Sequence, residues 1–125
     1  KETAADRKSA LKRRRVRALT TKQDRSLEKS KHFNRYFQTV RDKIRKQLKR
    51  NYTGFSEEGE VRLMFTLISD GSMDQYMIDQ PRSTDDKLLL EVAELSLIDS
   101  APFPKFPGGL KKNRITFNVV VSFKR

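Results

Sequence analysis

The sequence predicts an α+β fold of two layers, in which a three-stranded antiparallel sheet carries two helices on one face. Three observations lead to this prediction. Residues 114–123 alternate between apolar and polar side chains, as in a strand with one buried face. The pair Asp70-Gly71 separates two other strand-like segments and predicts a hairpin. Residues 33–48 and 88–100 carry apolar side chains at helical spacing. The expected order is helix, strand, strand, helix, strand, with both helices on the apolar face of the sheet.

Charge divides the chain into two segments. The 125 residues have a formal net charge of +12, yet residues 1–53 hold 19 Lys and Arg against 5 Asp and Glu, while residues 54–125 hold 9 against 11. Residues 1–32 contain few apolar side chains, so we expect a basic linker there, helical or flexible, and a folded domain in residues 33–125. The basic run at residues 12–17 fits a solvated linker, or contact with nucleic acid or anionic lipid.

The chain lacks several features that would point to particular classes of protein. It contains no cysteine, so disulfides and thiolate chemistry are excluded. It has no apolar run of about 18 residues that could span a membrane, and no signal peptide. Because it begins with Lys1 and not with Met, we expect a fragment of a longer protein, in which any membrane anchor would lie upstream.

The first helix is predicted from a stripe of apolar side chains at spacings of three and four residues, formed by Phe33, Phe37, Val40, Ile44 and Leu48, with Tyr36 alongside. A stripe of this kind is typical of a core, although its aromatic members could also stack on bases. Basic residues cover the remainder of the helix surface. Asn51 and Gly54 can end the helix.

The hairpin is expected to contain a type I′ turn with Asp70 and Gly71 at its centre, since Asp-Gly accepts the positive φ angles of that turn. The first strand is expected from Glu60 to Ser69, and Pro81 stops the second strand. This turn predicts three cross-strand pairs on the core face, which are Leu67 with Asp74, Phe65 with Tyr76, and Leu63 with Ile78. The outer face of the hairpin then carries Met64, Ile68, Met73 and Met77.

The second helix is expected from residue 88 to residue 100. Ser83 and Asp86 have the spacing of a capping box at its start, and Pro102 ends it. Three prolines keep residues 102–109 extended, and the two phenylalanines of this segment are expected to fill gaps between helix and sheet. The inner side chains of the last strand are expected in the core, namely Ile115, Phe117, Val119, Val121 and Phe123.

No constellation of residues for catalysis or for holding a cofactor or metal is visible. His32 is the only histidine, and no Ser/His/Asp set can be assembled around it. The acidic residues at the hairpin turn and at the start of the second helix have structural explanations, and their spacing is not that of a calcium loop. We therefore expect a protein that is not an enzyme, with no catalytic residues, no cofactor and no metal.

Residues 33–125 resemble the C-terminal domain of the TonB/TolA family of energy-transducing proteins. The resemblance rests on the helix with Tyr36, Val40, Arg41, Ile44 and Leu48, on the hairpin turn at 69–72, on the polar break at 81–84, on Ala-Pro-Phe-Pro-Lys-Phe-Pro at 101–107, and on the terminal strand. It implies a periplasmic, non-catalytic adaptor, anchored in the inner membrane by an N-terminal helix that this chain lacks. Its partners would be an inner-membrane proton-channel motor and a peptide of an outer-membrane transporter or Tol-system protein, with no nucleic acid, and it would be a monomer or weak dimer.

The candidate binding site is the edge of the last strand, because an unpaired edge can accept the backbone of another chain. Its expected partner-binding residues are Arg114, Thr116, Asn118, Val119, Val120 and Ser122. An edge strand can also be merely tolerated when charges blunt it, but here the charges lie at the strand ends. Two alternatives remain open. One is a nucleic-acid-binding module using residues 8–50, and the other is a strand-exchanged oligomer that uses the same edge.

Overall fold

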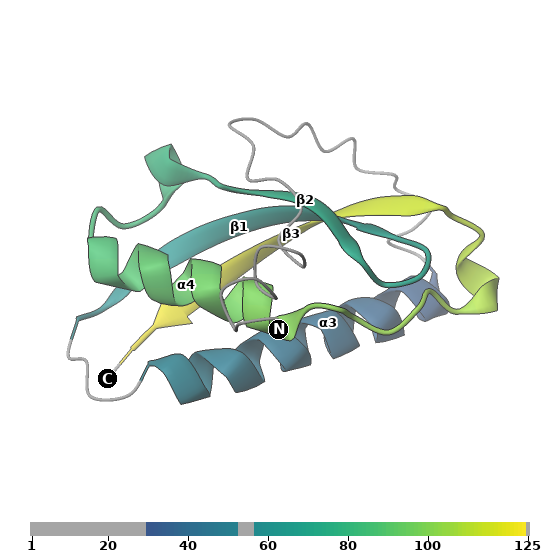
Figure 1. The fold of residues 1–125 in the computed structure, drawn as a ribbon, viewed down its shortest axis with the longest axis horizontal. Helices are drawn as coiled ribbons and strands as arrows, with labels where there is room; N and C mark the ends of the chain where they lie inside the picture. Colours follow the sequence, from purple (N-terminus) through teal and green to yellow (C-terminus); the bar gives the residue numbers. More distant parts are fainter. Residues whose placement is uncertain (1–29, 53–56, 125) are drawn as a thin grey trace, which may run out of the picture.

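The computed structural model describes residues 30–52 and 57–124. Its elements are helix α3 (Lys31–Asn51), strand β1 (Gly59–Ile68), strand β2 (Met73–Ile78), 3₁₀ turn η1 (Gln80–Arg82), helix α4 (Lys87–Ser100), 3₁₀ turn η2 (Gly108–Leu110) and strand β3 (Arg114–Phe123). Both helices lie on one side of the sheet, so the predicted fold class and element order are confirmed (Figure 1). Most of the predicted linker lies outside the described residues, but Lys31 and His32 belong to the first turn of α3.

The sheet has the order β2-β1-β3, with every neighbouring pair antiparallel. β1 occupies the centre, which leaves β3 at one edge. β1 and β3 pair without interruption over ten positions, from Gly59 opposite Phe123 to Ile68 opposite Arg114. This uninterrupted ladder pairs β3 with β1 along the whole length of both strands.

The hairpin turn differs from the predicted type I′ turn. Gly71 has a φ of +92°, but Asp70 does not have the positive φ that a type I′ turn requires at both central positions. Instead the loop has three residues, because Ile68 N–H donates to the Ser72 carbonyl (3.0 Å) and Gly71 N–H to the Ile68 carbonyl (2.8 Å). The Asp70 carboxylate accepts from Ser72 N–H at 2.9 Å and supports this turn.

The three-residue loop shifts the register next to the turn, and a bulge corrects it further along. The predicted pairs of Phe65 with Tyr76 and of Leu63 with Ile78 are confirmed, whereas the pair of Leu67 with Asp74 is wrong. Leu67 instead faces Met73, and the register shifts between Thr66 and Leu67, so that one extra residue of β2 is accommodated. Met73 therefore lies in the core, 1% exposed, and not on the outer face as predicted.

One core lies between the helices and the sheet. α3 contributes Tyr36, Val40 and Ile44, and its remaining stripe residues Phe33, Phe37 and Leu48 pack against this core while partly buried. Phe117 of β3 is the centre of an aromatic cluster, with ring centroids 5.4 to 6.0 Å away on Phe33, Tyr36, Phe37 and Phe65. The prediction that the stripe of the first helix packs in a core is thus confirmed.

The two helices begin at side-chain caps. Ser30 Oγ accepts from Phe33 N–H (3.2 Å) at the start of α3. At α4 the cap is Asp86, whose carboxylate accepts from two backbone N–H groups at 2.9 and 3.2 Å, so the predicted capping box led by Ser83 is wrong. Ser83 Oγ instead accepts from Arg62 N–H (2.9 Å) and donates to the Asp79 carbonyl (2.7 Å), because η1 holds it against the sheet.

The segment after α4 fastens the helices to the hairpin. Phe103 N–H donates to the Gly71 carbonyl (2.9 Å) and Phe106 N–H to the Ser69 carbonyl (2.8 Å). Both phenylalanine side chains are buried, and the Phe103 ring stacks on Phe65 at 5.9 Å, which confirms their predicted role as gap fillers. The Tyr36 hydroxyl donates to a carbonyl of the same segment, that of Pro104, at 2.6 Å.

Candidate partner-binding edge

The backbone hydrogen bonds of β1 show whether the N–H and C=O groups of each residue face β2 or β3. On the β2 side, Arg62 N–H donates to Ser83 Oγ and the Arg62 carbonyl accepts from Asp79 N–H, both at 2.9 Å. The Glu60 carbonyl accepts from Thr84 N–H on the same side at 2.8 Å. Because this direction alternates along an antiparallel strand, the even-numbered residues of β1 bond toward β2 and the odd-numbered ones toward β3.

The same alternation defines the free edge of β3. Val119 lies opposite Leu63 and Phe117 opposite Phe65, so the odd-numbered residues of β3 bond to β1. The even-numbered residues point their N–H and C=O groups to the edge that no other strand of the described chain occupies. Their side chains lie on the sheet face away from the helices. The edge is thus formed by Thr116, Asn118, Val120 and Ser122.

Two of the predicted site residues have a different environment from these four. The Val119 side chain is 7% exposed and its backbone groups pair with Leu63. Val119 therefore supports the structure of β3 but offers no group to a partner at the free edge. Arg114, at the start of the strand, forms an ion pair with Asp74 of β2, with 2.6 Å between Nη2 and Oδ2. Its guanidinium therefore already has a carboxylate partner across the sheet.

The side chains on the outer face of β3 differ between its ends and its middle. Thr116 Oγ1 is 2.8 Å from Thr66 Oγ1, and Ser122 Oγ donates to the Glu60 carboxylate at 3.3 Å. Asn118 and Val120, between them, have exposed side chains, and Val120 is 44% exposed. The middle of the edge therefore offers an amide and an apolar side chain to a partner.

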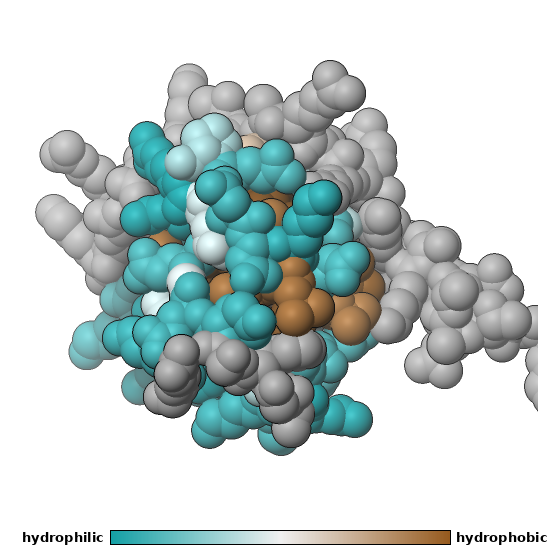
Figure 2. Space-filling model, turned by 90° about the vertical axis from the view of Figure 1, so that its left-hand side faces the viewer, coloured by the Kyte–Doolittle hydropathy of each residue, from teal (hydrophilic) through white to brown (hydrophobic). Residues whose placement is uncertain are grey.

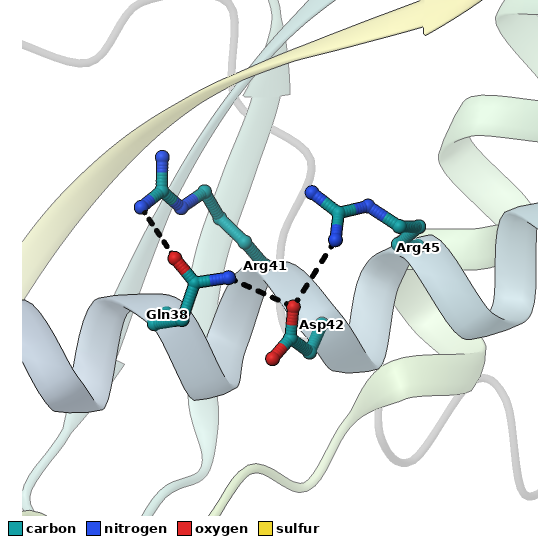
Figure 3. A network of polar contacts seen from close by, with 4 residues as sticks. All are labelled: Gln38, Arg41, Asp42 and Arg45. Carbon is teal, nitrogen blue, oxygen red and sulfur yellow. Dashed lines mark hydrogen bonds and ion pairs between the residues drawn. The ribbon is translucent and has the colours of Figure 1, made fainter.

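One flank of α3 borders this edge. The Phe37 ring lies 5.4 Å from Phe117 of β3, and the Arg41 guanidinium lies over the outer side of Phe37, 4.6 Å from its centroid. Gln38 Oε1 accepts from Arg41 Nη2 at 2.9 Å and holds the guanidinium in place (Figure 3). Lys43, about 160° around the helix from Arg41, contacts the Pro102 carbonyl on the opposite flank. A strand added to β3 would therefore lie beside Phe37 and Arg41.

Sequence reasoning missed these two neighbours of the edge. It assigned Phe37 to the core stripe and Arg41 to the basic surface of the first helix, and both descriptions are correct as far as they go. The position of these two residues beside the edge depends on tertiary structure, because α3 lies under β3 and not under β2. Amphipathic spacing shows which side of a helix is buried but not which strand covers it.

No group of three or more His, Cys, Asp or Glu side chains within residues 30–52 and 57–124 could hold a metal ion. Burial raises the pKa of Tyr36 to about 12, so its phenol remains a protonated donor to Pro104. Neither of the described helices is long and apolar enough to cross a bilayer.

Comparison with known proteins gives one informative similarity. No family model matches the chain, and no curated protein matches it by sequence. Among solved structures it is similar to the solution structure of the Helicobacter pylori TonB C-terminal domain, with a TM-score of 0.58 and 19% sequence identity. The match covers 86% of this chain and 96% of that domain. This chain therefore has the fold of a TonB C-terminal domain, as the motif resemblance predicted.

Proposed function

We propose that this domain is a non-catalytic periplasmic adaptor that binds a client peptide along the free edge of β3. In this role it couples a proton-driven motor of the inner membrane to an outer-membrane client, either in TonB-dependent transport or in a Tol-type envelope function. The client segment is an extended peptide of an outer-membrane transporter or Tol-system protein. The motor is engaged by a membrane-anchored segment upstream of this chain.

The open edge of β3 is the observation that carries the proposal. Soluble proteins usually protect such edges with charge, proline or a covering element. Here the charged residues Arg114 and Lys124 lie at or beyond the strand ends, and residues 115–123 carry none. Four alternate residues of β3 direct their N–H and C=O groups to an edge that no strand of the described chain occupies, which is the requirement for β-augmentation. The similarity to a TonB domain supports the same reading at the level of fold.

The test uses two substitutions of one edge residue. Asn118→Pro removes an edge N–H donor and places a ring in the path of a guest strand, while Asn118→Ala removes only the amide side chain. The probes are synthetic peptides that cover the N-terminal segments of outer-membrane transporters from the source organism. Binding is followed by ¹⁵N NMR, which also reports whether each variant is folded.

We expect a subset of these peptides to bind the natural protein and the Asn118→Ala variant with similar affinity. We expect Asn118→Pro to weaken binding by at least about tenfold, the equivalent of one hydrogen bond. A folded Asn118→Pro variant that binds as tightly as the natural protein would refute binding at the edge. If no peptide binds the natural protein, the client class is wrong.

The same edge can pair with a second copy of the chain, which is the competing use of this surface. Sedimentation over a concentration range distinguishes the two uses. Association that Asn118→Pro abolishes, together with the absence of peptide binding, would identify the protein as a strand-paired oligomer.

A further inference from the structure

Positive charge in the described part of the chain is concentrated on one helix. α3 holds eight Lys and Arg but only one acidic residue, Asp42, whereas residues 57–124 hold eight Lys and Arg and eleven Asp and Glu. Seven cations of α3 are exposed, namely Lys31, Arg35, Arg41, Arg45, Lys46, Lys49 and Arg50. The domain is therefore electrically polarised, with a basic helix on a body of opposite sign.

The exposed side of α3 is charged but not apolar. Among the described residues, the only large apolar side chains classed as exposed are Leu88 and Val120, and neither belongs to α3. The aromatic side chains of the helix pack on the core, so no ring is presented for stacking on bases. Figure 2 shows one end of the molecule, where hydrophilic residues make up most of the coloured surface and surround an apolar patch. A partner of α3 must therefore be recognised by charge.

The single acidic residue of this helix is engaged by its own neighbours. Asp42 Oδ1 accepts from Gln38 Nε2 at 2.9 Å and lies 3.3 Å from Arg45 Nη1, while Gln38 also holds Arg41 (Figure 3). These contacts run along the surface of the helix and leave further N–H donors on both guanidinium groups. The cations from Lys31 to Lys49 extend over about 27 Å at the rise of an α-helix.

We propose that the outer face of α3 docks on the surface of an anionic phospholipid bilayer. A cluster of several Lys and Arg on an amphipathic helix is the arrangement that binds anionic headgroups. Because the apolar side of α3 is already buried in the core, the attachment is peripheral and is reversed by salt. A bilayer is preferred to a nucleic acid because α3 presents no ring for stacking on bases and its exposed cations are spread along the whole helix.

This docking leaves the β3 edge accessible. The exposed face of α3 points away from the sheet, whereas the edge opens to the side of the sheet, past Phe37 and Arg41. Bilayer contact and strand pairing therefore use different surfaces, which adjoin at Arg41. The inference does not depend on the proposed adaptor function, and each can fail without the other.

The first test measures partitioning of the full chain onto vesicles of phosphatidylcholine with about 30% phosphatidylglycerol, and onto phosphatidylcholine alone. The α3 variant replaces Arg45, Lys46 and Lys49 with Gln. A matched control removes three positive charges elsewhere, by replacing Arg82, Lys87 and Lys105 with Gln. Circular dichroism checks that both variants are folded.

We expect binding only to the anionic vesicles and its loss at high salt. Each cation at the surface contributes about a fivefold increase in partitioning, so the α3 variant should lose on the order of 100-fold and the control a few-fold at most. Asp42→Asn should raise partitioning about fivefold, because it removes the only acidic residue of the face. Equal losses in the α3 variant and in the control would overturn the proposal.

The second test measures the orientation of the bound protein. The sequence contains no cysteine, so a single fluorophore can be placed at Gln38→Cys on the outer face of α3 or at Gln75→Cys on β2. A nitroxide on the lipid headgroups should quench the first fluorophore and not the second. Equal quenching at both positions would show that another part of the chain makes the contact. Tighter binding of a 20-base-pair DNA duplex, with the same dependence on the α3 cations, would identify a nucleic-acid surface instead.

Discussion

Proline substitutions at two adjacent positions of β3 should have very different effects on the free energy of unfolding. Val119 N–H points into the ladder toward Leu63, whereas Asn118 N–H points to the free edge. Proline has no N–H, so Val119→Pro removes a hydrogen bond inside the sheet and Asn118→Pro does not. Proline is found on edge strands at positions of the second kind.

The size of the difference follows from the surroundings of Leu63. Loss of one ladder hydrogen bond costs about 1 kcal/mol, and a buried carbonyl that is left without a donor costs about 1–3 kcal/mol more. Leu63 is 0% exposed, so water cannot replace the missing donor. Val119→Pro should therefore lower the free energy of unfolding by about 2–4 kcal/mol. Asn118→Pro should lower the free energy of unfolding by about 1 kcal/mol or less, because the backbone only has to adjust to the φ angle that proline requires.

Urea unfolding followed by circular dichroism measures this difference. The midpoint for Val119→Pro should lie about 1–2 M below that for Asn118→Pro. Val119→Ala and Asn118→Ala are the controls, because they remove the same side chains and keep both N–H groups. Equal midpoints for the two proline variants would refute the assignment of even-numbered residues to the free edge.

Three further substitutions test other parts of the structure. Gly71→Ala should lower the free energy of unfolding by at least about 2 kcal/mol, because φ is +92° there and a Cβ atom would overlap the Phe103 carbonyl; a neutral effect in thermal unfolding would contradict this turn. Asp86→Ala should lower the free energy of unfolding by about 1 kcal/mol and speed amide hydrogen exchange at the start of α4. Ser83→Ala should leave that exchange unchanged, and the reverse result would mean that the cap is wrongly assigned. The free energy of unfolding should fall between about pH 10 and pH 12, because the pKa of Tyr36 is raised from 10.0 to about 12 in the folded state and the unfolded chain therefore loses this proton first. Tyr36→Phe should make this fall less steep. An unchanged slope in the variant would exclude Tyr36 as the origin of the fall.

The elements of this fold could be predicted from the sequence because their signals are local. Alternation along residues 114–123 and the apolar stripe of the first helix depend only on the period of each structure, and both predictions are confirmed. The turn was less predictable, since Asp-Gly is compatible with both two-residue and three-residue loops. The backbone hydrogen bonds of the turn and the packing of Met73 into the core show which loop forms.

The candidate site was predictable only in part, for the same reason. The residues on the outer face of β3 can be predicted from alternation. The direction of their N–H groups cannot, because it depends on which residues of β1 bond to β2 and which bond to β3. The ion pair of Arg114 with Asp74 spans two strands that are distant in the sequence. The position of Arg41 beside the edge depends on where α3 packs. These features arise from tertiary structure, which a single sequence pattern does not encode.

The packing of α3 beneath β3 has a mechanical consequence. The Phe33 ring stacks on Phe117 at 5.9 Å near one end of the helix, and Tyr52 contacts Phe123 at 4.9 Å near the other, so helix and strand advance in the same direction. Tension applied at the start of α3 and resisted by a strand held on β3 would act along the strand axis. Such a load shears the ten paired positions of β1 and β3 together and does not peel them one at a time. In the proposed adaptor, the domain would thus resist force in the direction from which a chain entering at Lys31 pulls.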